Sequence, residues 1–138
     1  MKGQYDNSQP IFRQIIDQIL LAIATGELTP GSKVAPVREL AYDYKVNPNT
    51  MQKSLAKLEE MGYMFTERTS GRYVTNDLAL IEGLKTKLPA QITEKYVADM
   101  LECGIFLDDI PGYVKNQLEV EYGFVERMTQ DGQYSSNQ

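Results

Sequence analysis

The sequence predicts a mainly α-helical protein with one small β-hairpin: an N-terminal winged helix-turn-helix followed by a short antiparallel helical dimerisation tail. Three observations indicate this fold class. Two short helical patterns joined by a tight turn lie within residues 37–60, a hairpin pattern follows at residues 63–75, and a long apolar stripe begins after Thr75. We therefore expect a winged helix-turn-helix over residues 1–75, a helical tail over residues 76–122 and a disordered C-terminus over residues 123–138.

Apolar residues at three- and four-residue spacing predict the first helix. The pattern starts after Pro10 and stops at Gly26, a residue type that commonly ends helices. A turn at residues 28–32 then leads to Lys33 and Val34, which we expect to form a short third strand beside the hairpin. The apolar stripe of the helix should form the core of the domain and consists of Phe12, Ile15, Ile16, Ile19, Leu20 and Ile23.

The helix expected after Asn47 carries the strongest functional signal. Asn47 can cap free backbone N–H groups, and Pro48 suits the first helical position because it has no N–H to satisfy. A helical projection turns Met51, Leu55 and Leu58 inward and leaves an outward face without acidic residues, formed by Asn49, Gln52, Lys53 and Ala56. Asn and Gln can bind adenine, and Lys can bind guanine or phosphate. This face indicates DNA reading, with a merely solvated helix face as the alternative.

A shorter helix before this one and a hairpin after it complete the pattern. Residues 37–44 form the shorter helix, and residues 45–47 give a connection of the length typical of a helix-turn-helix. After Gly62, two runs rich in aromatic or β-branched residues flank a turn at residues 68–70. Arg68 and Arg72 border the tip of this predicted wing, where they could reach phosphates or a minor groove.

Residues 10–75 as a whole resemble the N-terminal signature of the GntR family of bacterial transcription regulators. The run VNPNTMQKSLAKLEEMGY at residues 46–63 is most similar to the small YtrA-like subfamily, in which a short helical tail replaces a large effector domain. The resemblance implies that Arg38 contacts DNA from the helix before the turn, and that Arg68 and Ser70 contact it from the wing. It also implies groove-reading positions at Asn47, Asn49, Thr50 and Gln52.

Three departures from the family pattern matter. Many members carry arginines at the positions of Pro48 and Gln52, so we expect readout to lean towards A·T pairs, DNA shape and phosphates. Ala35-Pro36 stands where the family usually has Pro-Ser, and Thr69 replaces the first wing glycine. The full set of predicted DNA-binding residues is Arg38, Lys45, Asn47, Asn49, Thr50, Gln52, Lys53, Arg68, Thr69, Ser70, Gly71 and Arg72.

The charge balance is acidic overall but uneven along the chain. The protein has 14 basic and 19 acidic residues, yet residues 1–75 carry a net charge of +1 and the remainder a net charge of −6. The cations of the first part fall on or beside the predicted DNA face, so local placement permits phosphate binding. They are Arg38, Lys45, Lys53, Lys57, Arg68 and Arg72.

Composition argues against several other classes of protein. With no histidine and one cysteine, the chain cannot build a Cys/His zinc site or a Ser–His or Cys–His nucleophile, so we expect neither enzyme nor cofactor. Cys103 is expected to be a small buried residue. The polar N-terminus and the charged interruptions of the longest apolar stretch predict a cytoplasmic protein without membrane contact.

The tail after Thr75 should contain two or three helices. Asn76 or Asp77 can cap the first, Pro89 should either kink or divide it, and Gly104 should end it. Asp108 can cap the final helix. The combined apolar stripe is too extended for one small domain to cover, so we predict a homodimer interface, with a monomeric fold-back as the alternative. Its residues are Leu84, Leu88, Ile92, Tyr96, Met100, Tyr113, Val114 and Leu118.

Together these observations predict a sequence-specific DNA-binding regulator that acts as a homodimer on palindromic double-stranded DNA. The resemblance further implies repression and control of a neighbouring transporter operon. A small-molecule effector, if there is one, would bind where the tail meets its partner or the winged helix. The alternative function is a winged helix that binds another protein, as the near-neutral charge of residues 1–75 would allow.

Overall fold

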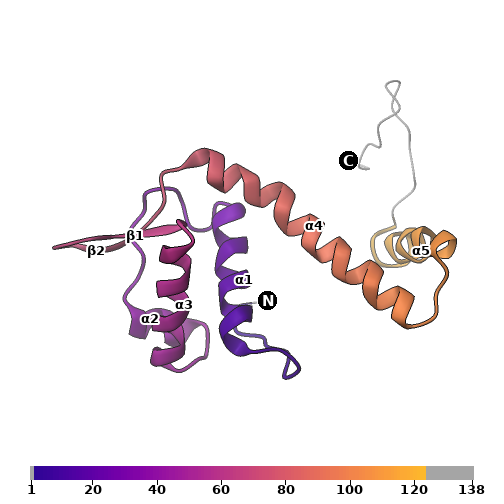
Figure 1. Cartoon of the computed structure of the whole chain (residues 1–138), viewed down its shortest axis with the longest axis horizontal. Coiled ribbons are helices and arrows are strands. Elements are labelled where there is room, and N and C mark those ends of the chain that lie inside the picture. The colour runs from indigo at the N-terminus through magenta and orange to yellow at the C-terminus, as the bar shows by residue number, and fades with distance from the viewer. Residues whose placement is uncertain (1, 124–138) are drawn as a thin grey trace. The chain divides into compact units, whose positions relative to one another are not determined.

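The computed structural model describes residues 2–123 and confirms a mainly helical fold with one antiparallel hairpin (Figure 1). The chain divides into two compact units, the first ending at Ala90 and the second beginning at Gln91. The predicted disorder of residues 123–138 concerns positions that, apart from Gly123, lie outside the described residues. In chain order the elements are α1 (Ile11–Ala24), α2 (Val37–Asp43), α3 (Pro48–Glu60), β1 (Met64–Glu67), β2 (Gly71–Val74), α4 (Leu78–Glu102), the 3₁₀ turn η1 (Leu107–Asp109) and α5 (Ile110–Tyr122).

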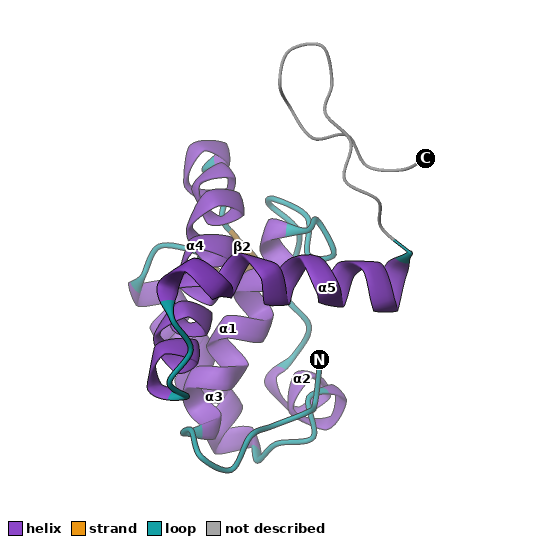
Figure 2. Cartoon of the chain, turned by 90° about the vertical axis from the view of Figure 1, so that its right-hand side faces the viewer, coloured by secondary structure: helices purple, strands orange, loops and turns teal. Residues whose placement is uncertain are grey.

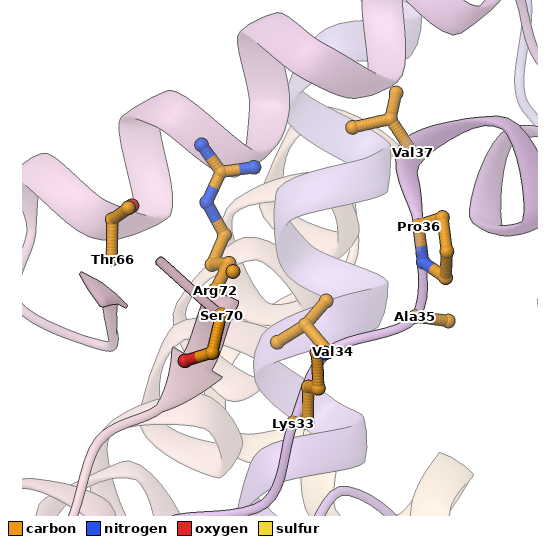
Figure 3. A pocket seen from close by; sticks show the side chains of 9 residues that line it. Lys33, Val34, Ala35, Pro36, Val37, Thr66, Ser70 and Arg72 are labelled. Carbon is orange, nitrogen blue, oxygen red and sulfur yellow. The ribbon is translucent and has the colours of Figure 1, made fainter. Parts of the chain in front are cut away.

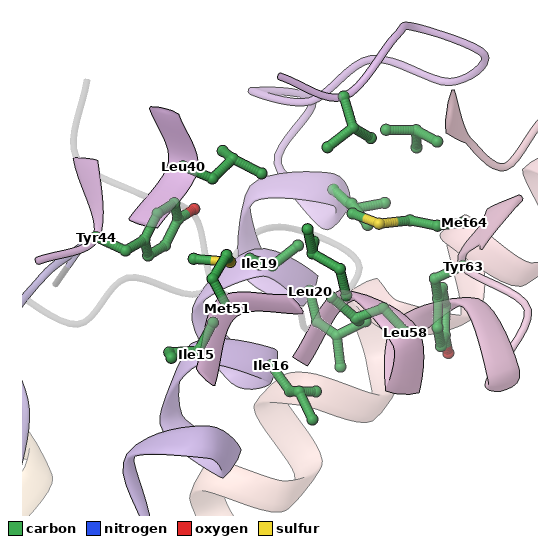
Figure 4. Close-up of a cluster of buried hydrophobic side chains, with 14 of the residues drawn as sticks. Ile15, Ile16, Ile19, Leu20, Leu40, Tyr44, Met51, Leu58, Tyr63 and Met64 are labelled. Atoms are coloured by element: carbon green, nitrogen blue, oxygen red, sulfur yellow. The ribbon is translucent and has the colours of Figure 1, made fainter. Parts of the chain in front are cut away.

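The core of the first unit forms where α1 packs against α3 (Figure 4). Six side chains from the two predicted apolar stripes are at most 1% exposed, and each contributes roughly 1.5–3 kcal/mol relative to an exposed position. They are Ile15, Ile19 and Ile23 of α1 and Met51, Leu55 and Leu58 of α3. Because these residues occupy one side of α3, the opposite side of the helix faces solvent.

Two backbone devices shape the turn between α2 and α3. The N–H of Val46 donates to the carbonyl of Ala41 at 2.9 Å and the N–H of Lys45 donates to that of Tyr42 at 3.1 Å, with Lys45 in the left-handed region at φ 57°. This is a Schellman end to α2, in which Lys45 takes the position that usually belongs to glycine. The side chain of Asn47 accepts a hydrogen bond of 2.7 Å from the N–H of Asn49, which confirms the predicted cap of α3.

The wing is a short hairpin in which Met64 pairs with Val74 and Glu67 with Gly71. At its tip the N–H of Ser70 donates to the carbonyl of Glu67 at 3.3 Å, and Gly71 supplies the positive φ of 117°. The positive φ of the turn is thus taken by Gly71, and Thr69, which stands at the position of the first wing glycine, does not need a positive φ. The predicted third strand is reduced to one isolated bridge between Lys33 and Tyr73, flanked by hydrogen bonds that join residues 32–34 to β2.

The segment before α1 packs against the end of α2, an arrangement that the sequence pattern did not predict. The hydroxyl of Tyr5 donates to the carbonyl of Tyr44 at 2.6 Å, and the side chain of Gln18 binds the backbone of Gly3 and Gln4. The ammonium of Lys2 lies 5.0 Å from the centre of the Tyr44 ring. The contacts of Tyr5 and Lys2 join the N-terminal segment to Tyr44 at the end of α2, where Tyr44 is buried with Leu40 (Figure 4).

Helix α4 is continuous through Pro89, so the alternative of two separate helices is wrong. Its first turns belong to the first unit, because Ile81 and Leu84 are buried in the core and Leu88 packs against it. This corrects the assignment of Leu84 to a dimer interface, since its side chain is 1% exposed within its own chain. It also explains why the first unit extends to Ala90 and not only to Thr75.

The second unit has little core of its own. Gly104 ends α4 as predicted, and the N–H of Ile105 donates to the carbonyl of Met100 at 3.1 Å. The cap residue of α5 is Asp109 and not Asp108, and its side chain makes no capping hydrogen bond. Within residues 91–123, Ile110 is the buried side chain, and Cys103 is exposed, so the expectation of a buried cysteine is wrong. Figure 2 shows the regular helix α5 along its length.

We predict that Tyr44 makes the fold sensitive to alkali. Burial, together with the nearby acidic groups Glu27 and Asp43 and with Tyr5, raises the pKa of Tyr44 from 10.0 to about 12. The unfolded chain therefore loses this proton first, so the stability from the neutral phenol is complete below pH 10 and is lost as the pH rises towards 12. At about pH 11 the loss amounts to roughly 1 kcal/mol.

In urea titrations between about pH 9 and pH 11, Tyr44→Phe should lose about 1 kcal/mol less of its unfolding free energy than the wild type. Tyr42→Phe is the control, because Tyr42 lies on the same helix with its side chain 84% exposed. Equal losses in all three proteins would contradict the role of Tyr44.

Candidate nucleic-acid and dimer interfaces

The exposed face of α3 is polar and carries no acidic side chain over its first three turns. Asn47, Asn49 and Gln52 are exposed, Thr50 is half-buried, and the first carboxylate is that of Glu59. The hydroxyl of Ser54 donates to the carbonyl of Thr50 at 2.9 Å and is buried on the inner side. The donors and acceptors of Asn49 and Gln52 are thus presented by a rigid helix, as direct readout of base edges requires.

Four basic residues near this face differ in how freely they can reach a phosphate. Arg38 in the first turn of α2 and Lys45 in the turn are exposed. Lys53 lies with its ammonium 5.0 Å from the centre of the Phe12 ring, so α1 orients it. Lys57 forms an exposed ion pair of 3.4 Å with Glu60. The structure therefore leaves Arg38 and Lys45 as the more freely presented charges of these four.

The tip of the wing presents Arg68, Thr69, Ser70 and Gly71, all of them exposed. The Oγ of Ser70 accepts a hydrogen bond of 2.9 Å from the hydroxyl of Tyr73. The rings of Tyr73 and Phe65 stack with centroids 5.7 Å apart across the two strands. These contacts stiffen the hairpin from within, so Arg68 extends from an ordered tip.

Arg72, expected at the wing tip, instead turns its guanidinium towards α3 (Figure 3). Its Nη2 lies 3.4 Å from Oε2 of Glu59, and the two side chains are only 17% and 32% exposed. Its Nε is buried and has no hydrogen-bond partner among the described residues. The side chain of Arg72 therefore does not extend freely from the wing tip, contrary to the expectation from the sequence.

A groove with a volume of about 400 Å³ is lined by residues of the wing and of the segment before α2 (Figure 3). Its polar lining includes Thr66, Ser70 and Lys33, and a Cβ on Gly71 would lie 3.3 Å from Cε of Lys33. Lys33 was predicted as a strand residue and not as a site residue. The expected pairing of residues 33–34 with the wing was the signal for a site role, because this pairing places the basic side chain of Lys33 beside the tip of the wing.

Most of the remaining predicted dimer residues are accessible. Ile92, Tyr113 and Val114 are 68%, 52% and 43% exposed, and Tyr96, Met100 and Leu118 are half-buried. In the second unit a groove of about 310 Å³ is lined by Tyr96, Met100, Tyr113, Val114, Gln117 and Leu118. Further apolar side chains that are at least 45% exposed in this unit are Leu101, Phe106, Leu107, Val120 and Tyr122.

The described part of the chain shows neither a metal centre nor a membrane helix. Among residues 2–123, no group of three or more His, Cys, Asp or Glu side chains is placed to hold a metal ion. Within the same range, no helix combines the length and the apolar character needed to cross a membrane.

Comparisons with known proteins agree with this geometry. The pattern described as bacterial regulatory proteins of the gntR family matches residues 12–74. The HTH-type transcriptional regulator YhcF of Bacillus subtilis is 35% identical over 119 residues, which cover 86% of this chain and 98% of YhcF. The HTH-type transcriptional repressor YtrA of the same organism is 33% identical over 111 residues, covering 79% of this chain and 85% of YtrA.

A solved structure extends the likeness to three dimensions. The GntR family transcriptional regulator from Listeria monocytogenes is 39% identical and superposes with a TM-score of 0.70, covering 81% of this chain and 98% of that one. A transcriptional regulator from Oenococcus oeni, 24% identical with a TM-score of 0.60, shares the fold. With identities above 30% over nearly the whole of YhcF and of the Listeria protein, this chain belongs to the GntR family of DNA-binding transcriptional regulators.

Proposed function

We propose that this protein is a repressor that binds a specific, palindromic DNA operator as a homodimer. The observation that carries the proposal is the exposed face of α3, where Asn49 and Gln52 stand on a buried, rigid helix without a neighbouring acid. Family membership supports DNA as the partner, and the name of the similar protein YtrA supports repression. In this proposal Asn47, Asn49, Thr50 and Gln52 read bases.

The cations and the wing have a different task. Arg38, Lys45, Lys53 and Arg68 neutralise phosphates and fix the register of the protein, while the exposed backbone and hydroxyls at residues 69–71 approach the DNA from the wing. Because Pro48 and Gln52 replace the arginines of many family members, readout leans towards A·T pairs and DNA shape.

Dimerisation is proposed from the second unit. This unit leaves several large apolar side chains exposed, among them Ile92, Tyr113 and Val114. A twofold contact between copies would bury them and would place two winged helices on a symmetric operator. Leu88 contributes little to the proposed interface, because its side chain already packs against the core of the first unit.

The direct test is fluorescence anisotropy with the DNA upstream of the protein's own gene and with a scrambled duplex, each at two salt concentrations. Tight, salt-sensitive binding to the upstream duplex alone is the expected result. Binding to neither duplex would favour the alternative, a winged helix that binds another protein. If the upstream duplex is bound, footprints on genomic DNA would identify the regulated genes, which the family resemblance predicts to include a transporter operon.

Two alanine variants should separate base reading from phosphate binding. Gln52→Ala should reduce the preference for the operator over scrambled DNA, with a loss of about 1–3 kcal/mol confined to the specific duplex. Arg38→Ala should weaken binding to both duplexes and lower the slope of log K against log salt by about 1. Lys87→Ala, on an exposed position of α4, controls for net charge. Equal losses on both duplexes for Gln52→Ala would contradict its reading role.

Lys45 allows charge and backbone conformation to be tested separately. Its φ of 57° suits glycine or asparagine, so Lys45→Gly should keep the fold and raise the unfolding free energy by about 1 kcal/mol. Lys45→Asn should likewise retain the turn. Both variants should bind every duplex more weakly, with the salt slope lower by about 1. An unchanged slope in both variants would show that Lys45 serves only the turn.

The dimer should depend on the apolar groove of the second unit. In sedimentation velocity at micromolar concentration, the wild type should be dimeric and Val114→Asp largely monomeric, because the new carboxylate would be buried without a partner. Asn116→Asp adds the same charge at an exposed position of α5 and should stay dimeric. A monomeric wild type would remove both the dimer and the palindromic operator.

A further inference from the structure

We propose that Arg72 and Glu59 form an ion pair that positions the wing against α3, and that neither residue contacts DNA itself. Both are thus positioning residues for the DNA-binding function proposed above, on which this inference rests. They set where the tip carrying Arg68 and Ser70 stands relative to the reading face of α3.

The pair is largely withdrawn from solvent. Nη2 of Arg72 lies 3.4 Å from Oε2 of Glu59, with the arginine side chain 17% and the glutamate side chain 32% exposed. Nε of Arg72 is buried and has no hydrogen-bond partner among the described residues. The carboxylate of Glu59 is therefore the acceptor recorded for this guanidinium. A buried cation that loses its one carboxylate is strongly destabilised where it stands. The contact with Glu59 therefore helps to hold the side chain of Arg72 in place.

The backbone of Arg72 lies at the centre of the wing. In the hairpin it pairs with Thr66, and its carbonyl accepts a hydrogen bond of 2.8 Å from the N–H of Val34. One residue thus joins both strands, the segment before α2 and, through its side chain, helix α3.

The backbone contacts that join the wing to α3 lie at the base of the hairpin. The wing leaves α3 through Gly62, whose φ of 91° marks a sharp change of direction. Hydrogen bonds from Tyr63 to Leu58 and from Thr75 to Tyr63 hold the base of the hairpin, but they lie at its root. The pair of Arg72 and Glu59 is the ion pair recorded between the hairpin and α3 in the described residues.

Lys57 and Glu60 provide an internal comparison on the same helix. Their ion pair has the same length, 3.4 Å, but the side chains are 45% and 72% exposed. Exposed pairs of this kind contribute little, because water and salt screen them. Glu60→Gln is therefore the matched control for Glu59→Gln: both remove one carboxylate from the last turn of α3, and only the second disturbs the wing.

The rival arrangement, in which Arg72 contacts a phosphate directly, predicts the opposite sign. Glu59 would then compete with DNA for the guanidinium, and Glu59→Gln would release it. Binding would become tighter than in Glu60→Gln, and Arg72→Met would lower the salt slope by about 1. In the positioning arrangement Glu59→Gln weakens binding relative to Glu60→Gln, and Arg72→Met leaves the salt slope unchanged.

The first measurement is amide hydrogen exchange in the free full-length protein, which needs no DNA. Glu59→Gln and Arg72→Met should each accelerate exchange in residues 64–74 by about tenfold or more, with the amides of α1 unchanged and Glu60→Gln indistinguishable from wild type. The double variant should exchange no faster than the faster single variant, because one interaction is lost in each case. Unchanged wing exchange in both single variants would overturn the proposal.

The second measurement is anisotropy with the upstream and scrambled duplexes used above. We expect Glu59→Gln and Arg72→Met to lose about tenfold in affinity for the upstream duplex at an unchanged salt slope. Tighter binding by Glu59→Gln than by Glu60→Gln would overturn the proposal in favour of a phosphate contact. If wild type binds neither duplex, the proposed function fails, whereas the exchange experiment still decides whether the pair positions the wing.

Discussion

The packing of α3 on α1 is the interaction on which the rest of the structure depends. Once Met51, Leu55 and Leu58 are buried, the rotation of α3 about its axis is fixed, and with it the direction of every polar side chain on the opposite face. A helix free to rotate by one residue would turn Gln52 through about 100° and away from a groove. The specificity proposed for this protein is thus a consequence of apolar burial.

The turn before α3 fixes where the helix begins relative to α2. Lys45 holds a left-handed backbone, which costs roughly 1–2 kcal/mol for a non-glycine residue, and such a conformation persists only where its surroundings enforce it. The two Schellman hydrogen bonds, the Asn47 cap and the contact from Tyr5 to Tyr44 supply that enforcement. Glycine would adopt this backbone conformation without strain, but only lysine also places a positive charge beside the helix proposed to read bases.

Local features of this fold could be predicted from the sequence, whereas the direction of long side chains could not. The stripe of α1, the Asn47 cap and the hairpin depend on periodicity and turn chemistry within a few residues. The burial of Leu84 depends on where α4 meets the core, and the turn of Arg72 towards Glu59 depends on how the hairpin folds back on α3. Pro89 removes one backbone donor from α4, but Lys85, whose carbonyl would have received it, lies at an exposed position where water can bind.

The uneven charge of the chain separates the two proposed interactions by their response to salt. In the proposed function residues 1–75 bind phosphate through a few placed cations despite a net charge of only +1, so counterion release should make DNA binding weaker as salt rises. The remainder of the chain, at −6, would have to bring like charges together in a dimer, and salt screens that repulsion while leaving apolar burial intact. An acidic tail also gains nothing from lying along DNA. In the proposed function the recognition of phosphate therefore falls to the winged helix, whereas dimerisation depends on apolar burial that must outweigh the repulsion between the acidic tails.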